Sequence, residues 1–131
     1  MRRHQSSLHV AHLVFLAAMT GVVATACRQP YRAEDLVGKY QLLCDGKKGD
    51  VLTLHRDGTF VQRFGTISNA GRWEELRGSV VLHEQQIMVG TRTFIAGHKI
   101  VGDLPIERTD AGPKLMYDEN TGWAYVRVRS D

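Results

Sequence analysis

The chain has 131 residues, 43% of them apolar and 8% aromatic, which fits one globular domain behind a leader. Its net charge is +3. Residues 1–26 hold two arginines and no acidic residue, so the rest of the chain has 15 basic and 14 acidic residues. A nucleic-acid-binding surface needs a cluster of basic residues. The nearest approach to one, Arg127 with Arg129, is expected to be a solvated strand end, so we expect no nucleic-acid partner.

Residues 1–26 have the features of a secretory signal peptide. The amino end is positive, an apolar core of suitable length follows at residues 13–24, and small residues precede Cys27. The alternative is an uncleaved membrane anchor, but residues 10–26 barely reach bilayer-spanning length and contain polar residues. We therefore expect the leader to be cleaved.

The leader resembles a bacterial lipoprotein signal, in which the Cys after the cleavage site is acylated. By this resemblance Cys27 is the lipidation site, residues 27–33 form a tether, and Arg28 permits sorting to the outer membrane. Each acyl methylene buried in a bilayer contributes about 0.8 kcal/mol, so several chains would hold the protein at the envelope, facing the periplasm. Lipoprotein signals usually carry Leu where Ala24 stands, so ordinary cleavage to a secreted or soluble periplasmic protein stays open.

The only other cysteine is Cys44. If Cys27 is acylated, Cys44 has no partner and is expected to be buried. If Cys27 keeps its thiol, a Cys27–Cys44 disulfide stays open. No neighbouring residue indicates that Cys44 is a nucleophile.

Past one helical turn at residues 33–37, the pattern predicts short strands joined by turns, with no helical period over ten residues or more. Strands are expected at residues 38–45, 51–56, 59–64, 71–75, 80–84, 87–89, 91–96, 98–101, 103–108, 114–117 and 123–129. Turns are expected at residues 46–49, 57–58, 68–71, 77–79 and 118–122. The region 87–101 holds two or three strands, and Pro105 suits an edge or a strand start.

Apolar residues alternate along these strands. Tyr40, Leu42 and Cys44 share one face, as do Leu52 with Leu54, and Phe60 with Gln62 and Phe64. Turn signals every eight to twelve residues are typical of a sandwich or barrel, and about eight strands fit a small antiparallel up-and-down β-barrel, an all-β fold. Such an interior is filled by side chains or holds one small ligand, and the large inward residues favour a filled core.

Three motifs resemble the small lipocalin-like lipoproteins of bacterial envelopes. They are Gly38-Lys-Tyr40, the hairpin Leu-x-Leu-x-x-Asp-Gly-Thr-Phe ending at Phe60, and Gly71-x-Trp73. The resemblance implies a lipocalin-like barrel over residues 34–131. Lipocalins place an Arg of the last strand over a Trp of the first, which implies that Arg127 or Arg129 stacks on Tyr40.

No catalytic or metal motif is present, and we expect neither an enzyme nor a cofactor. His55, His83 and His98 fall on separate predicted strands, so a metal site would have to be assembled from distant strands, and we expect none. Three aromatic residues could line a pocket or a binding face but are more typical of a core: Trp73, Trp123 and Tyr125.

Two functions follow from these expectations. In the first, the protein is a lipid-anchored, non-catalytic module that binds a small apolar ligand or an envelope partner. In the second, it is an envelope inhibitor or assembly accessory that acts through its surface loops. An internal cavity of several hundred Å³ would favour the first, and a dry interior with an apolar patch at one barrel end would favour the second. The sequence does not indicate ligand-binding residues.

Overall fold

The computed structural model describes residues 31–129, the side chain of His98 excepted. These residues form one short helix and eight strands: α1 Ala33–Leu36, β1 Gly38–Cys44, β2 Lys47–Leu54, β3 Thr59–Phe64, β4 Ile67–Leu76, β5 Ser79–Val89, β6 Arg92–Thr109, β7 Gly112–Asp118 and β8 Trp123–Arg127. The strands form a closed antiparallel barrel in chain order, which confirms the predicted up-and-down topology. The expected signal-peptide helix and Cys27 lie outside the described residues.

The barrel closes where β1 pairs with β8. The two strands run antiparallel, with Tyr40 opposite Arg127 and Leu42 opposite Tyr125. Closure gives every strand a neighbouring strand on each side over part of its length, while residues 92–105 of β6 pair with β5 alone. Within the described chain, no helix is long and apolar enough to cross a membrane.

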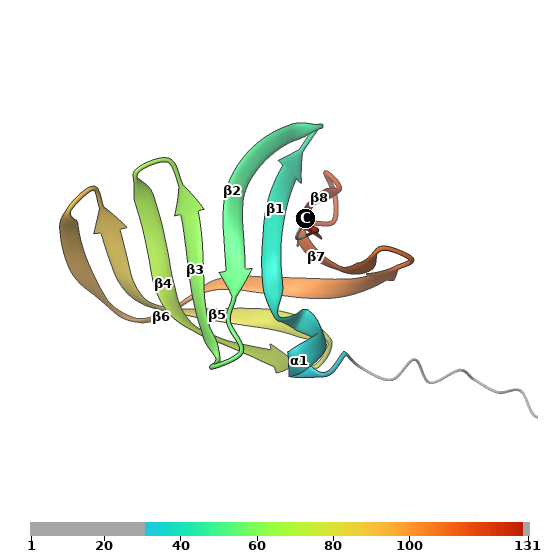
Figure 1. Ribbon diagram of the computed structural model, residues 1–131, viewed down its shortest axis with the longest axis horizontal. Helices are drawn as coiled ribbons and strands as arrows, with labels where there is room; N and C mark the ends of the chain where they lie inside the picture. Colours follow the sequence, from blue (N-terminus) through green and yellow to red (C-terminus); the bar gives the residue numbers. More distant parts are fainter. Residues whose placement is uncertain (1–30, 130–131) are drawn as a thin grey trace, which may run out of the picture.

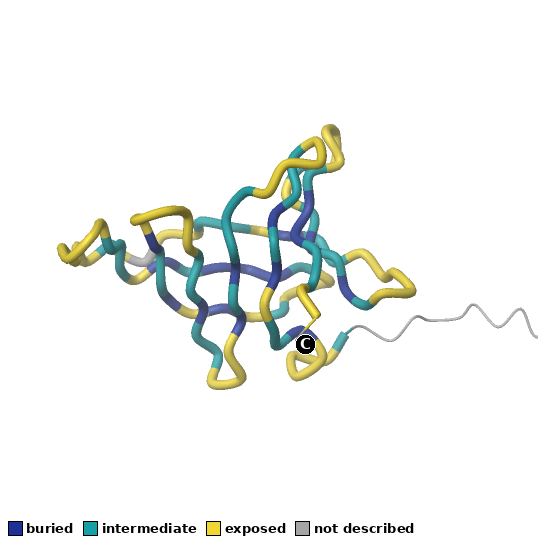
Figure 2. Tube along the Cα trace, turned by 45° about the horizontal axis from the view of Figure 1, so that its top comes forward, coloured by how far each residue is buried: buried dark blue, intermediate teal, exposed yellow. Residues whose placement is uncertain are grey.

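The two ends of the barrel differ. Figure 1 places α1 and the β2–β3 turn at one end, which we call the closed end. The turns of the β1–β2, β3–β4 and β5–β6 hairpins project at the opposite end, which we call the open end. Figure 2 shows the buried residues in the middle of the barrel, while the hairpin tips are exposed.

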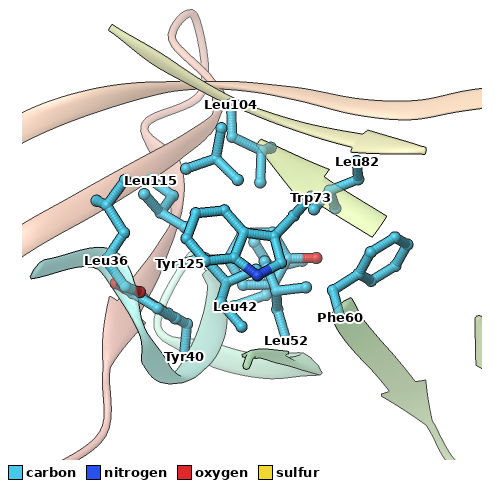
Figure 3. Packing of buried hydrophobic residues seen from close by; sticks show 12 residues of the cluster. Leu36, Tyr40, Leu42, Leu52, Phe60, Trp73, Leu82, Leu104, Leu115 and Tyr125 are labelled. Atoms are coloured by element: carbon cyan, nitrogen blue, oxygen red, sulfur yellow. The ribbon is translucent and has the colours of Figure 1, made fainter. Parts of the chain in front are cut away.

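The core fills the closed end and the middle of the barrel. Large side chains from all eight strands and from α1 converge there, with Trp73 among them (Figure 3). The buried members are Leu36, Tyr40, Leu42, Leu52, Leu54, Phe60, Trp73, Val80, Leu82, Leu104, Leu115 and Tyr125. Because this cluster and the closed ladder both lie within residues 31–129, that part of the chain contains a complete folding unit.

Tyr40 and Arg127 fasten the closed end. The Tyr40 hydroxyl donates a hydrogen bond of 2.7 Å to the carbonyl of Leu36, the fully buried residue of α1. Arg127 donates from Nη2 to the Tyr40 hydroxyl at 2.9 Å, and its guanidinium carbon lies 5.4 Å from the Tyr40 ring centroid. The predicted Arg–Tyr40 contact is confirmed with Arg127, which is therefore more than a solvated strand end.

Two predicted turns are wrong. The first hairpin turns at Asp45 and Gly46, both with positive φ, and residues 47–49 belong to β2. The segment 68–71 is part of β4, and the turn before it lies at residues 65–66. In each case a run of small or polar residues resembled a loop, whereas the pairing of the strands decided where the chain reverses.

Residues 87–89 are the end of β5, whereas the segments predicted at 91–96, 98–101 and 103–108 form the single strand β6, 18 residues long. Its first part pairs with β5 as far as Pro105, and its last part pairs with β7 from Ile106. Pro105 therefore stands beside the point where the pairing with β7 begins, and the lack of an amide hydrogen is tolerated there. Pro105 is therefore not a strand start, but it pairs with β5 alone, as a residue at an edge does.

Replacing Tyr40 with Phe should lower the free energy of unfolding by about 1–3 kcal/mol, because the phenol bonds both Leu36 and Arg127. Tyr117→Phe is the matched control, since it removes the same hydroxyl from a side chain that is 54% exposed. Urea denaturation of the two variants and the wild type measures the difference. Equal stability of the two variants would contradict the role given to Tyr40.

Candidate functional site

A pocket of about 310 Å³ opens into the barrel from the open end. It lies above the filled core, and Leu42 belongs to both. Its lining combines apolar and polar side chains: Leu42, Gly49, Asp50, Gln62, Phe64, Ile67, Asn69 and Tyr117. The expectation of a filled interior therefore holds for the closed end and the middle of the barrel but not for the open end.

Strand alternation brings the polar lining residues inside. Asp50 continues the inward face of Leu52 and Leu54, and Gln62 lies between the inward residues Phe60 and Phe64. Both Asp50 and Gln62 are half-buried. The barrel thus changes from apolar to polar along its interior faces as the strands approach the open end.

Three of these side chains and Tyr125 form a hydrogen-bonded polar cluster. The buried Tyr125 hydroxyl donates to Asp50 Oδ2 at 2.6 Å. Gln62 Nε2 donates to the Tyr125 hydroxyl at 2.8 Å and also to Asp50 Oδ2. Asn69 Nδ2 donates to Gln62 Oε1 at 3.4 Å. We call Asp50, Gln62, Asn69 and Tyr125 the polar cluster.

The pKa of Tyr125 is raised well above its usual range. Burial is the main cause, and the hydrogen bond to Asp50 and the negative charge of that carboxylate add to it. The phenol therefore stays protonated and serves as a fixed donor to Asp50.

A bulge in β2, where Gly49 and Asp50 lie opposite the single residue Leu42 of β1, positions Asp50. The register between β1 and β2 shifts between Gln41 and Leu43, which disturbs the regular ladder at Leu42. Gln41 Nε2 donates to the carbonyl of Gly49 at 2.8 Å and to that of Asp50 at 3.2 Å, so the backbone beside Asp50 is held by this side chain. A Cβ on Gly49 would lie 3.0 Å from Leu42 Cδ2, which explains a glycine at this place in a strand.

The pocket has an apolar rim. Phe64 is 64% exposed and Ile67 is 47% exposed, although both lie on the inward faces of their strands. On the other side Tyr117 stacks on Trp123 with the ring centroids 6.4 Å apart. The rim is therefore an apolar surface that borders the polar cluster.

A second hollow, of about 370 Å³, lies on the outside of the barrel. Lys39, Thr53 and Val61 line it, and they are neighbours across β1, β2 and β3 on the face opposite to Leu52. Its lining includes none of the polar cluster, so the open-end pocket is the better candidate for a site.

The predicted aromatic residues have different roles. Trp73 belongs to the core and donates from Nε1 to the carbonyl of His55 at 2.9 Å. Trp123 supports the rim through Tyr117, and Tyr125 belongs to the polar cluster. The structure thus gives different roles to three residues that the sequence analysis had treated as one group.

The histidines do not form a centre within the described residues. Nε2 of His83 lies 3.0 Å from Oε1 of Glu74. His55 is exposed beside the β2–β3 turn. No cluster of three or more metal-ligating side chains is found in the part of the chain that the structure describes.

Cys44 is half-buried against the core, and its relation to Cys27 lies outside the described residues.

Sequence reasoning missed Asp50, Gln62 and Asn69 as site residues. Asp50 stands two residues before Leu52 on the same face, and Gln62 had already been placed on an inward face. A polar residue on the apolar face of a strand was therefore the available signal.

Comparison of the chain with family models, curated proteins and solved structures found no match.

The raised pKa of Tyr125 makes stability depend on alkaline pH. Above about 10, the usual pKa of tyrosine, the unfolded chain loses this proton more readily than the folded chain, so the free energy of unfolding falls. Tyr125→Phe removes this contribution, and its stability should fall less steeply between pH 9 and about 11 than that of the wild type. Denaturant titrations at each pH measure the slopes, and parallel slopes would contradict the assignment.

Proposed function

We propose that this protein is a lipid-anchored envelope lipoprotein and a non-catalytic module that binds a small apolar ligand. The observation that carries the proposal is the open-end pocket, with its apolar rim and polar cluster. Ligand sites are typically concave and mostly apolar, with a few polar groups that orient the ligand. A volume of about 310 Å³ is at the lower end of the usual range, so a small ligand fits best.

Because the closed end is filled, a ligand would have only one direction of entry into the barrel. α1 covers that end with Leu36, and Trp73 and Phe60 fill the space behind it. A ligand would therefore enter and leave between the hairpin tips of the open end, where the rim residues are exposed.

The proposed anchor would attach at the closed end. The described chain enters the barrel through α1, and acylation at Cys27 would leave only a few residues before it. An extended chain spans at most about 3.6 Å per residue, so residues 27–31 reach roughly 18 Å. With this tether the membrane lies near the closed end, and the mouth of the pocket faces away from it.

A second function is favoured by a different observation. Ile95 is 92% exposed on β6, and Ile100 on the same strand is 60% exposed. An apolar surface of this kind suits contact with another protein. An envelope inhibitor or assembly accessory would use this surface rather than the pocket.

Narrowing the mouth of the pocket should weaken ligand binding. Ile67→Trp adds bulk at the rim and should weaken binding of the neutral apolar dye N-phenylnaphthylamine by about tenfold or more. Leu76→Trp is the matched control, because Leu76 lies at the other end of the same strand and is 51% exposed.

Fluorescence titration of residues 31–131 measures this affinity. The wild type and Leu76→Trp should bind one dye with affinities that agree to within about twofold. Absence of saturable binding by the wild type, or equal loss in both variants, would contradict a ligand site in this pocket.

The proposed anchor has its own measurement. Mass spectrometry of the protein extracted from membranes should find an amino terminus at Cys27 that carries acyl mass, because acylation of this residue is what would hold the chain at a bilayer. Cys27→Ala should lose the acyl mass and leave the membrane fraction. Retention of residues 1–26, or a Cys27 terminus without acyl mass, would show that the protein is not lipid-anchored.

A further inference from the structure

The chemistry of the polar cluster points to a class of ligand. We propose that the open-end pocket prefers an amphiphile with a protonated amine, the ammonium group lying on Asp50 and the apolar chain lying over Phe64 and Ile67. This inference rests on the proposed function and narrows it from a small apolar ligand to a cationic one.

Asp50 offers an acceptor that the described chain leaves open. Both side-chain donors, the Tyr125 hydroxyl and the Gln62 amide, bond the same oxygen, Oδ2. Within the described chain, Oδ1 accepts no hydrogen bond. Two neutral donors stabilise a carboxylate without cancelling its charge. A cationic group at Oδ1 would donate a hydrogen bond to that oxygen and would also neutralise the charge of the carboxylate.

No basic side chain of the described residues neutralises Asp50. Its carboxylate takes part in neither of the ion pairs found there, and the pocket lining contains no Lys, Arg or His. Lys48, two residues earlier on β2, is exposed. Because Asp50 is half-buried, water screens its charge less than at the surface, so the pocket attracts cations and disfavours anionic ligands such as fatty acids.

The apolar rim continues beyond the pocket. Phe64 pairs with Ile67 across β3 and β4, and Ile67 pairs with Val89 across β4 and β5. One step further, Ile87 pairs with Phe94 across β5 and β6. Residues paired across neighbouring strands lie on the same face of a sheet. This row of side chains leads outward from the pocket and gives an apolar chain a surface to cover.

The charge requirement distinguishes this proposal from simple apolar binding. Three compounds share one eight-carbon chain and differ in the head group: n-octylamine, n-octanol and n-octanoate. Each is titrated against residues 31–131 loaded with N-phenylnaphthylamine. We expect the amine to displace the dye at concentrations about tenfold lower than the alcohol, and octanoate to be the weakest of the three.

Two carboxylate variants test the role of Asp50. Asp50→Asn keeps the shape of the side chain and should make the amine no better than the alcohol in this variant. Asp45→Asn is the matched control, because it removes the same charge from an exposed position on the neighbouring β1–β2 turn. It should keep the amine preference. Circular dichroism of both variants checks that the barrel is intact.

Each outcome has a separate meaning. If none of the three compounds displaces the dye and the dye itself does not bind, the proposed ligand-binding function fails. If the alcohol displaces the dye as well as the amine does in the wild type, the pocket binds ligands and the cationic preference alone is refuted. The same holds if Asp50→Asn and Asp45→Asn behave alike. The comparison in the wild type needs no variant to fold.

Discussion

The pairing of the first strand with the last is the constraint on which the rest of the structure depends. Tyr40 and Arg127 are opposite each other in this pairing, and their side chains meet at the closed end. The same Tyr40 hydroxyl bonds the carbonyl of Leu36 and so fixes α1 across the barrel. One phenol thus joins the first strand, the last strand and the helix, and links closure of the sheet to closure of one end.

Closure also creates the polar cluster. Tyr125 is on the last strand, 75 residues from Asp50 on the second, and the two meet only because β8 returns to β1. A buried hydroxyl without a partner would be costly, and here it is satisfied by a carboxylate and an amide. The cluster marks the level at which the packed core ends and the open pocket begins. Fold and site therefore have a common origin in the β1–β8 pairing.

The sequence predicted local features well because their causes are local. The Asp57–Gly58 turn needs a residue that accepts positive φ, and Gly58 has a φ of 84°. The alternation of Leu52 and Leu54 placed them correctly in the core. The contact between Tyr40 and Arg127 was predicted from a family resemblance and not from spacing.

Other features depend on partners that no local pattern reveals. The position of Pro105 is tolerated because of where the pairing of β6 with β7 begins, which cannot be seen in the strand itself. Residues 68–71 look like a loop, yet β3 and β5 pair with them on both sides. Asp50 and Gln62 were visible as polar residues on apolar faces, but their partner Tyr125 came from the far end of the chain.

A barrel that is filled at one end and open to a ligand at the other explains both the core and the pocket. Nuclear magnetic resonance of 15N-labelled residues 31–131, titrated with n-octylamine, tests this directly. The amide shifts should change most at Asp50, Gln62 and Tyr125, while those of Leu36 and Tyr40 at the closed end stay in place. Changes confined to the outer faces of the strands, or spread evenly over the barrel, would contradict it.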